Sequence, residues 1–254
     1  MIAGAALAGW RFPLRAWRAA WPWLGLQIVV AAALTVTPIR VAGWGWDGAL
    51  LLASLLAWSR LANLAIDKPP PRGLRAETAA AARLAGALIL TAIFLFLLAL
   101  LGFVILLCFA YAAASAGHGF VASDVTTWPG AVEVRGRILV SGIGLAIGAA
   151  LLWTALRVSL AVFATADEGV VRMIATWPIT RGRTLTILAA VILVALPPLA
   201  VVLGLRLLAP SLGAQGVAFA QALVVLGYWA PAKLGVLGRL YLDLRPDAPQ
   251  TPRR

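Results

Sequence analysis

Long stretches without a charged side chain set the strongest constraint on what this chain can fold into. Five of them reach or approach the roughly 18 apolar residues that mark a membrane-spanning helix, and they cover residues 19–39, 84–117, 138–156, 184–205 and 207–232. Hydrophobic residues make up 63% of the chain and charged residues 12%, whereas soluble domains average about 45–50% and 25%. The sequence therefore excludes a water-soluble fold and predicts an all-α, polytopic membrane protein.

Six helical spans follow when proline, glycine and charge clusters are taken as boundaries. We expect a single transmembrane domain over residues 1–254, with spans at 19–38, 47–66, 84–114, 138–165, 184–208 and 214–239. Arg60 and Arg157 interrupt the second and fourth spans, so both spans require a guanidinium that reaches an interface or faces protein. The uncharged run at 84–117 would measure about 51 Å as one helix. We expect it to tilt or to project beyond the roughly 30 Å hydrocarbon core.

The distribution of basic residues predicts the orientation of these spans. With both termini inside, 17 of the 21 Lys and Arg residues lie on the inner side, and only Arg40, Arg135, Arg137 and Arg206 lie outside. Because basic loops are retained in the cytoplasm, we expect a bacterial inner-membrane protein with cytoplasmic termini. The net charge of +12 then reflects topology. We expect contact with anionic lipid headgroups at the cytoplasmic rim and no nucleic-acid partner. The N-terminus lacks the charge-first order of a signal peptide, so no cleaved signal is expected.

Several chemistries lack the residues they need. Cys108 is the only cysteine and His118 the only histidine, so an internal disulfide is impossible. Zinc sites of the usual type need three or four Cys or His ligands, and nucleophilic triads need a base beside the nucleophile. Asp167 and Glu168 are neighbours in the sequence, but adjacent residues of a helix point in different directions, so their carboxylates are not expected to converge on one metal ion. We expect no enzymatic activity, no catalytic residue, no metal and no cofactor.

Two of the longer connections differ in composition. The inner segment at 67–83 opens with three prolines that end the second span, and it continues as an Ala-rich helical approach to the third. The outer segment at 117–137 carries His118, Asp124, Glu133 and a Trp128-Pro129-Gly130 turn. We expect this outer segment to be a periplasmic loop or a short re-entrant or interfacial piece.

Residues 156–188 carry the most informative pattern in the chain. Helical spacing of i, i+3, i+4 and i+7 predicts a short amphipathic helix in the cytoplasmic interface, with its apolar face formed by Val170, Met173, Ile174 and Trp177. We expect Asp167 to cap this helix and Pro178 to end it. Arg157 precedes Asp167 by about 15 Å of helix rise. It is expected either to snorkel or to pair with Asp167 or Glu168.

The same segment resembles a known family. An arginine near the end of a span, an acidic-Gly turn, a tryptophan and a Thr-Arg-Gly sequence before the next span are carried here by Arg157, Asp167, Glu168, Gly169, Trp177, Thr180, Arg181 and Gly182. This pattern is similar to the membrane domain fused to some glycerophosphodiester phosphodiesterases and found alone in bacterial inner-membrane proteins. The resemblance implies a six-helix domain of unsettled function. It implies no hydrolysis, because the family's activity belongs to a separate metal-dependent barrel domain.

Small residues on the fourth span are candidates for close helix packing. They are Gly142, Gly144, Ala146 and Gly148, with Ala150 completing a spacing of four. Packing within the bundle is the expected role, and homodimerisation is the alternative. Polar or helix-bending residues within other spans are candidates for lining a path: Gln27, Arg60, Asn63, Pro197, Pro198, Gln221, Pro231 and Lys233.

Two classes of function are compatible with these features. The first is a non-enzymatic accessory, assembly or scaffold subunit that contacts lipid or a protein partner. The alternative is a transporter or permease-like subunit, in which residues 170–177 would dock a motor protein as coupling helices do. A polar cavity at mid-membrane distinguishes them, since a transporter requires one.

Overall fold

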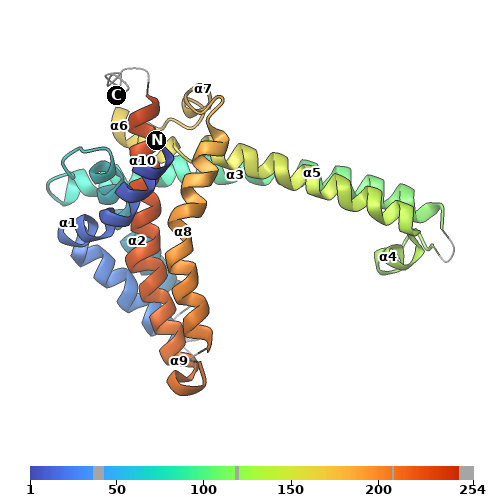
Figure 1. Cartoon of the computed structure of the whole chain (residues 1–254), viewed down its shortest axis with the longest axis horizontal. Helices are drawn as coiled ribbons and strands as arrows, with labels where there is room; N and C mark the ends of the chain where they lie inside the picture. The colour runs from blue at the N-terminus through green and yellow to red at the C-terminus, as the bar shows by residue number, and fades with distance from the viewer. Residues whose placement is uncertain (37–42, 118–119, 208, 246–254) are drawn as a thin grey trace. The chain divides into compact units, whose positions relative to one another are not determined.

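The computed structural model describes residues 1–36, 43–117, 120–207 and 209–245 (Figure 1). Regular structure within these ranges is entirely helical, which confirms the all-α prediction for them. Arg40 and His118 lie outside the described residues. The helices group into two compact units, one formed by Met1–Leu88 with Arg157–Arg254 and the other by Ile89–Leu156.

Four helices are long and apolar enough to cross a membrane: Leu74–Ser115, Val134–Glu168, Thr184–Leu207 and Phe219–Leu244. A shorter apolar helix covers Leu50–Ala65. These helices make the chain a membrane protein by length and composition. The count of six spans and the sides on which the loops lie stay predictions.

In the first unit, helix α1 (Ile2–Val36) packs against α2 (Gly43–Ala65), α8 (Thr184–Leu207) and α10 (Ala230–Leu244). Three glycines allow α10 to pack closely against α1 and α2. A Cβ on Gly9 would lie 2.2 Å from a Val236 methyl, one on Gly235 would lie 2.5 Å from Phe12, and one on Gly238 would lie 2.5 Å from the Ala65 Cβ. Small-residue packing of this kind brings helix backbones together.

Helix α1 bends in its middle. Ala20 departs from helical geometry, with φ −130° and ψ 18°, and Pro22 follows two residues later. Proline removes a backbone N–H and clashes with the preceding turn. The carbonyl of Ala19 beside the bend accepts a hydrogen bond from the Arg60 guanidinium at 3.4 Å. An arginine of α2 thus donates a hydrogen bond to a backbone carbonyl at the kink.

The predicted sixth span is built from three segments. Helix α9 (Ala209–Ala222) continues into a π-helix, η2 (Leu223–Trp229), and then into α10. A π-helix displaces backbone hydrogen bonds from the regular pattern. Here the indole N–H of Trp17 donates to the carbonyl of Gly227 at 2.8 Å. This bond fastens the irregular segment to α1.

In the second unit, the later part of α3 (Leu74–Ser115) runs antiparallel beside α5 (Val134–Val158) (Figure 1). A Cβ on Gly102 would lie 2.5 Å from the Ile147 side chain, so the glycine makes room for that side chain of α5. Of the predicted packing residues, Gly144 faces α3, since a Cβ built on it would lie 3.8 Å from Leu106 Cδ1. No described atom outside α5 lies within 4 Å of a Cβ built on Gly142 or Gly148, and Ala146 is exposed.

The connection between α3 and α5 folds into a short helical cap. A 3-10 turn, η1 (Val125–Thr127), leads into α4 (Trp128–Ala131), so the predicted Trp-Pro-Gly turn takes the form of a single helical turn, in which proline is tolerated at the start. The ring of Tyr111 meets Trp128 edge-on, with centroids 5.4 Å apart. Asp124 caps η1, and hydrogen bonds from Thr126 lower the pKa of its carboxyl.

Candidate functional site

An ion-pair network centred on Asp167 lies in the first unit. The carboxylate Oδ1 of Asp167 is 2.6 Å from Lys68 Nζ. Its Oδ2 accepts a hydrogen bond from the Tyr241 hydroxyl at 2.9 Å and lies 3.5 Å from Arg245 Nη1. Lys68 also donates to the Asp167 backbone carbonyl. The network therefore joins helix α6 (Ala161–Glu168) to α10 and to the α2–α3 connection.

Local geometry explains why these groups meet. Gly169, with φ 72°, ends α6 in the left-handed conformation and places Asp167 in the last helical turn. A carboxylate there opposes the helix dipole, and the cations of Lys68 and Arg245 offset this cost. Tyr241 and Arg245 are four residues apart on or beside α10 and so share a face. The predicted role of Asp167 as an N-cap of the next helix is wrong.

A second ion pair joins α2 to the start of α3. Arg60 donates to the Glu77 carboxylate, and the Glu77 side chain is only 7% exposed. The Arg60 guanidinium also lies 5.9 Å from the centroid of the Trp23 ring. Arg60 therefore faces protein, which was one of the two conditions the second span required. Glu77 occupies the first turn of α3, where the helix dipole favours a negative charge.

The predicted pairing of Arg157 with Asp167 or Glu168 is wrong. The Arg157 guanidinium carbon lies 4.3 Å from the centroid of the Trp177 ring, and Nη2 donates to the Trp177 carbonyl at 3.1 Å. Glu168 instead pairs with Arg172 at 2.7 Å. Helix α6 carries the acidic pair away from Arg157, whereas residues 170–180 fold back beside it.

Two buried hydroxyls complete this contact. The Thr176 hydroxyl lies 3.1 Å from the carbonyl of Arg157, and the Thr180 hydroxyl lies 3.5 Å from it, with the Thr176 carbonyl as its nearer acceptor at 3.0 Å. Both threonines are fully buried. The turn between α5 and α6 leaves this carbonyl near a helix end, where a side-chain donor replaces the regular backbone bond.

The predicted amphipathic helix over 170–177 is wrong in extent. Only α7 (Thr176–Ile179) is helical there, and Pro178 lies inside α7. The hydroxyl of Thr165 accepts a hydrogen bond from the backbone N–H of Arg172 at 3.1 Å, which holds the preceding residues in a turn. Ile174 is left 71% exposed.

The residues that carry the family resemblance therefore do not form one cluster. Arg157, Trp177 and Thr180 come together, whereas Asp167 turns toward α10. Glu168 and Arg181 are exposed. Gly169 and Gly182 both take positive φ values of 72°, a conformation in which glycine avoids the strain of a side chain.

Three of the polar residues considered for a path, Gln27, Asn63 and Lys233, have local contacts. Gln27 donates to the Ser54 hydroxyl at 2.9 Å, and Asn63 donates to the Ser59 carbonyl at 2.8 Å. Lys233 Nζ lies 6.0 Å from the centroid of the Trp229 ring. These contacts tie neighbouring turns and helices together.

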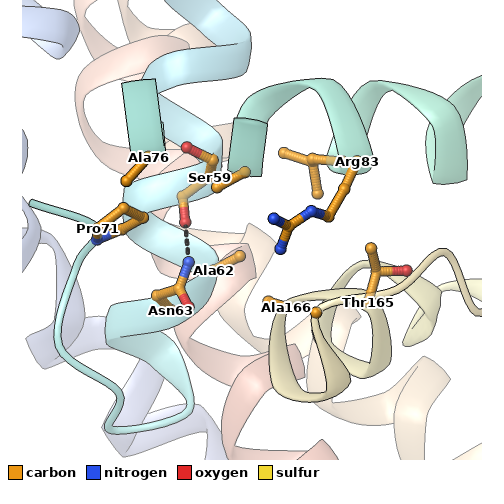
Figure 2. A pocket seen from close by; sticks show the side chains of 11 residues that line it. Ser59, Ala62, Asn63, Pro71, Ala76, Arg83, Thr165 and Ala166 are labelled. Atoms are coloured by element: carbon orange, nitrogen blue, oxygen red, sulfur yellow. Dashed lines mark hydrogen bonds between the residues drawn. The ribbon is translucent and has the colours of Figure 1, made fainter. Parts of the chain in front are cut away.

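A pocket of about 230 Å³ opens beside the network, between the end of α2, the start of α3 and α6 (Figure 2). Ser59, Asn63, Arg83, Thr165 and Gly169 contribute to its lining, and the remaining wall is formed mainly by alanines, Pro71 and Leu84. The Arg83 guanidinium points into the space between α2 and α6 (Figure 2).

Sequence reasoning missed Lys68, Glu77, Arg83, Tyr241 and Arg245 as site residues. Lys68 and Asp167 are 99 residues apart, so no local spacing links them. The nearest sequence signal was the position of Glu77 at the start of a predicted Ala-rich helix. Within the described ranges, no three His, Cys, Asp or Glu residues form a group able to hold a metal ion.

Comparison with known proteins adds no relative: no protein-family model, curated protein or solved structure matches this chain.

Proposed function

We propose that this chain is a non-enzymatic integral membrane protein that acts as an accessory, assembly or scaffold subunit, in contact with anionic lipid or a protein partner. The observation that carries the proposal is that the acidic groups of the first unit form ion pairs within the fold. Each described carboxylate side chain there lies within ion-pair distance of a basic one: Asp67 of Arg15, Glu77 of Arg60, Asp167 of Lys68 and Arg245, Glu168 of Arg172, and Asp243 of Arg239. Four of these six ion pairs join separate parts of the fold, and only the pairs of Glu168 with Arg172 and of Asp243 with Arg239 are local, so most of the acidic groups hold helix ends in place.

The remaining basic residues support contact with lipid headgroups. Eight arginines of the first unit are exposed and form no ion pair with a described residue: Arg11, Arg18, Arg72, Arg75, Arg83, Arg181, Arg183 and Arg206. All of them except Arg206 belong to segments that the excess of basic residues assigns to the cytoplasmic side. Juxtamembrane basic residues attract the anionic inner leaflet by about 1 kcal/mol each.

The finer topology is part of the same proposal. Six helices span a bacterial inner membrane, both termini are cytoplasmic, and residues 170–179 lie in the cytoplasmic interface. On the resemblance of residues 156–188, the chain belongs with the membrane domains of the glycerophosphodiester phosphodiesterase type.

One observation favours the permease-like alternative. Val170, Val171 and Ile174 are 50%, 40% and 71% exposed in the turn between α6 and α7. An exposed apolar turn of this kind suits docking of a cytoplasmic motor protein.

Affinity purification of the full chain from native membranes tests both functions. A scaffold subunit is expected to co-purify with a membrane protein whose recovery survives Ile174→Glu. Loss of a co-purifying ATPase in Ile174→Glu would instead establish the permease-like alternative. The matched control is Leu74→Glu, because Leu74 is 69% exposed at the start of α3. Turnover of phosphodiesters by the purified protein would contradict the non-enzymatic proposal.

A further inference from the structure

The pocket between α2, α3 and α6 combines one cation with a small, mostly apolar wall. Its volume is about 230 Å³, below the roughly 300–1,000 Å³ of pockets that enclose drug-sized ligands. It is open enough for Arg83 to remain exposed. The pocket therefore suits one small charged group that enters from the surface.

Arg83 is the basic residue that lines the pocket, and it differs from three paired basic residues of the same region in its electrostatic surroundings. Lys68, Arg60 and Arg172 are each paired with a carboxylate. No described carboxylate lies within ion-pair distance of Arg83. Its guanidinium faces the pocket (Figure 2), so the pocket presents a positive charge that the described part of the chain leaves uncompensated.

The backbone of α6 comes close to this guanidinium. A Cβ built on Gly169 would lie 3.4 Å from Arg83 Nη1, which is ordinary contact distance. Asn63 contributes a second polar side chain to the wall, with its amide nitrogen held by the Ser59 carbonyl. That bond fixes the amide, so its carbonyl oxygen is available to accept a hydrogen bond from a hydroxyl.

We propose that this pocket binds a phosphate ester group through Arg83. The planar guanidinium offers parallel N–H donors that match two phosphate oxygens, and the alanine-lined wall fits the carbon skeleton beside the phosphate. The inference rests on the proposed function, since it treats this end of the helices as the headgroup level. The phosphate can belong to an anionic phospholipid or to a soluble phosphate ester.

Lipid retention measured by native mass spectrometry tests the site. The full chain is released from nanodiscs of phosphatidylglycerol or of phosphatidylcholine, and bound lipids are counted. Wild type is expected to retain one phosphatidylglycerol more tightly than the Arg83→Ala variant, by about tenfold or more, because hydrogen bonds to charged groups contribute at least that factor. The matched control, Arg206→Ala, removes an exposed arginine at the end of α8, outside the pocket and outside the segments predicted to face the inner leaflet, and is expected to behave as wild type.

Two further arms keep the test decisive. Ala80→Leu fills the pocket without changing charge, and it is expected to lose the same lipid even if Arg83→Ala fails to fold. Competition with glycerol 3-phosphate distinguishes the sources: displacement of the lipid, or protection of wild type alone against heating, identifies a soluble ester as a ligand of the same site.

Equal retention by wild type, Arg83→Ala and Ala80→Leu, with no effect of the soluble ester, would overturn the proposal. Equal loss in Arg206→Ala would also overturn it, since the binding would then follow net charge. Neither result bears on the scaffold function, which is decided by the co-purifying protein.

Discussion

Arg157 stacks on Trp177, with its guanidinium carbon 4.3 Å from the ring centroid, and also donates to the Trp177 backbone carbonyl. One side chain thus uses both the face of a ring and the carbonyl of the same residue. Together with the buried hydroxyls of Thr176 and Thr180 on the Arg157 carbonyl, the contact fastens the end of α5 to the segment that leads into α8.

Replacing either partner of this contact is expected to destabilise the first unit. A cation–π contact contributes about 0.5–2 kcal/mol, depending on desolvation. Arg157→Gln and Trp177→Leu are each expected to lower the thermal midpoint, and the double variant is expected to lose less than the sum. The same cycle with Glu168→Gln serves as the control and is expected to be additive, since Glu168 pairs with Arg172. Additivity between Arg157 and Trp177 would contradict the contact.

The Asp167 network gives a second prediction. Asp167→Asn keeps an acceptor for Tyr241 but leaves Lys68 and Arg245 without their carboxylate. Loss of one partner of a buried pair costs about 3–5 kcal/mol. We expect about 1–3 kcal/mol because the pair is only partly buried, with the Lys68 side chain 40% exposed. Denaturation in mild detergent measures the change.

A surface ion pair provides the matched control for this change. Asp243 and Arg239 form an i,i+4 pair at 3.2 Å, which is worth about 0.3–0.5 kcal/mol. Asp243→Asn is therefore expected to change stability little. A similar loss in Asp243→Asn and Asp167→Asn would show that the network adds nothing beyond a surface pair.

Membrane orientation is checked by reporter fusions. With six spans and an inner C-terminus, a reporter after Arg245 is expected to be cytoplasmic, and one inserted between Ala122 and Asp124 is expected on the opposite side. The insertion site lies in the exposed cap between α3 and α5, where added residues disturb little packing. The same side for both reporters would contradict the six-span topology.

The features that the sequence predicted depend on residues close together in the chain, whereas those it missed depend on contacts between distant residues. Charge-free runs predicted the helical membrane protein because lipid leaves few other folds for such a backbone. The motif at Arg157, Trp177 and Thr180 marked residues that do meet, since the fold-back spans only about 20 residues. The predicted pairing of Arg157 with Asp167 or Glu168 was wrong, because the spacing of residues along a helix does not show where the chain turns back on itself. Lys68 and Asp167 meet through tertiary packing alone, which spacing along one sequence cannot encode.

Replacing a glycine of α10 by alanine gives a prediction in which close packing and helix propensity have opposite effects on stability. Alanine normally stabilises a helix interior over glycine by about 0.5–1 kcal/mol. At Gly238 an added Cβ would lie 2.5 Å from the Ala65 Cβ and 2.8 Å from the Ala65 carbonyl oxygen. Backbone atoms yield only if α2 and α10 separate, and overpacking costs about 1–3 kcal/mol. Gly238→Ala is therefore expected to lower the free energy of unfolding.

Gly204 on α8 is the matched control for Gly238. No described atom beyond the helix's own backbone lies within 4 Å of its added Cβ, so Gly204→Ala is expected to be neutral or stabilising. Gly142 and Gly148 on α5 have the same open surroundings, and Gly142→Ala is expected to follow Gly204→Ala in a monomer. A loss of stability in Gly142→Ala that grows with protein concentration would show that this face of α5 packs against a second copy of the chain. A stabilised Gly238→Ala would mean that α2 and α10 are farther apart than the glycine contacts require.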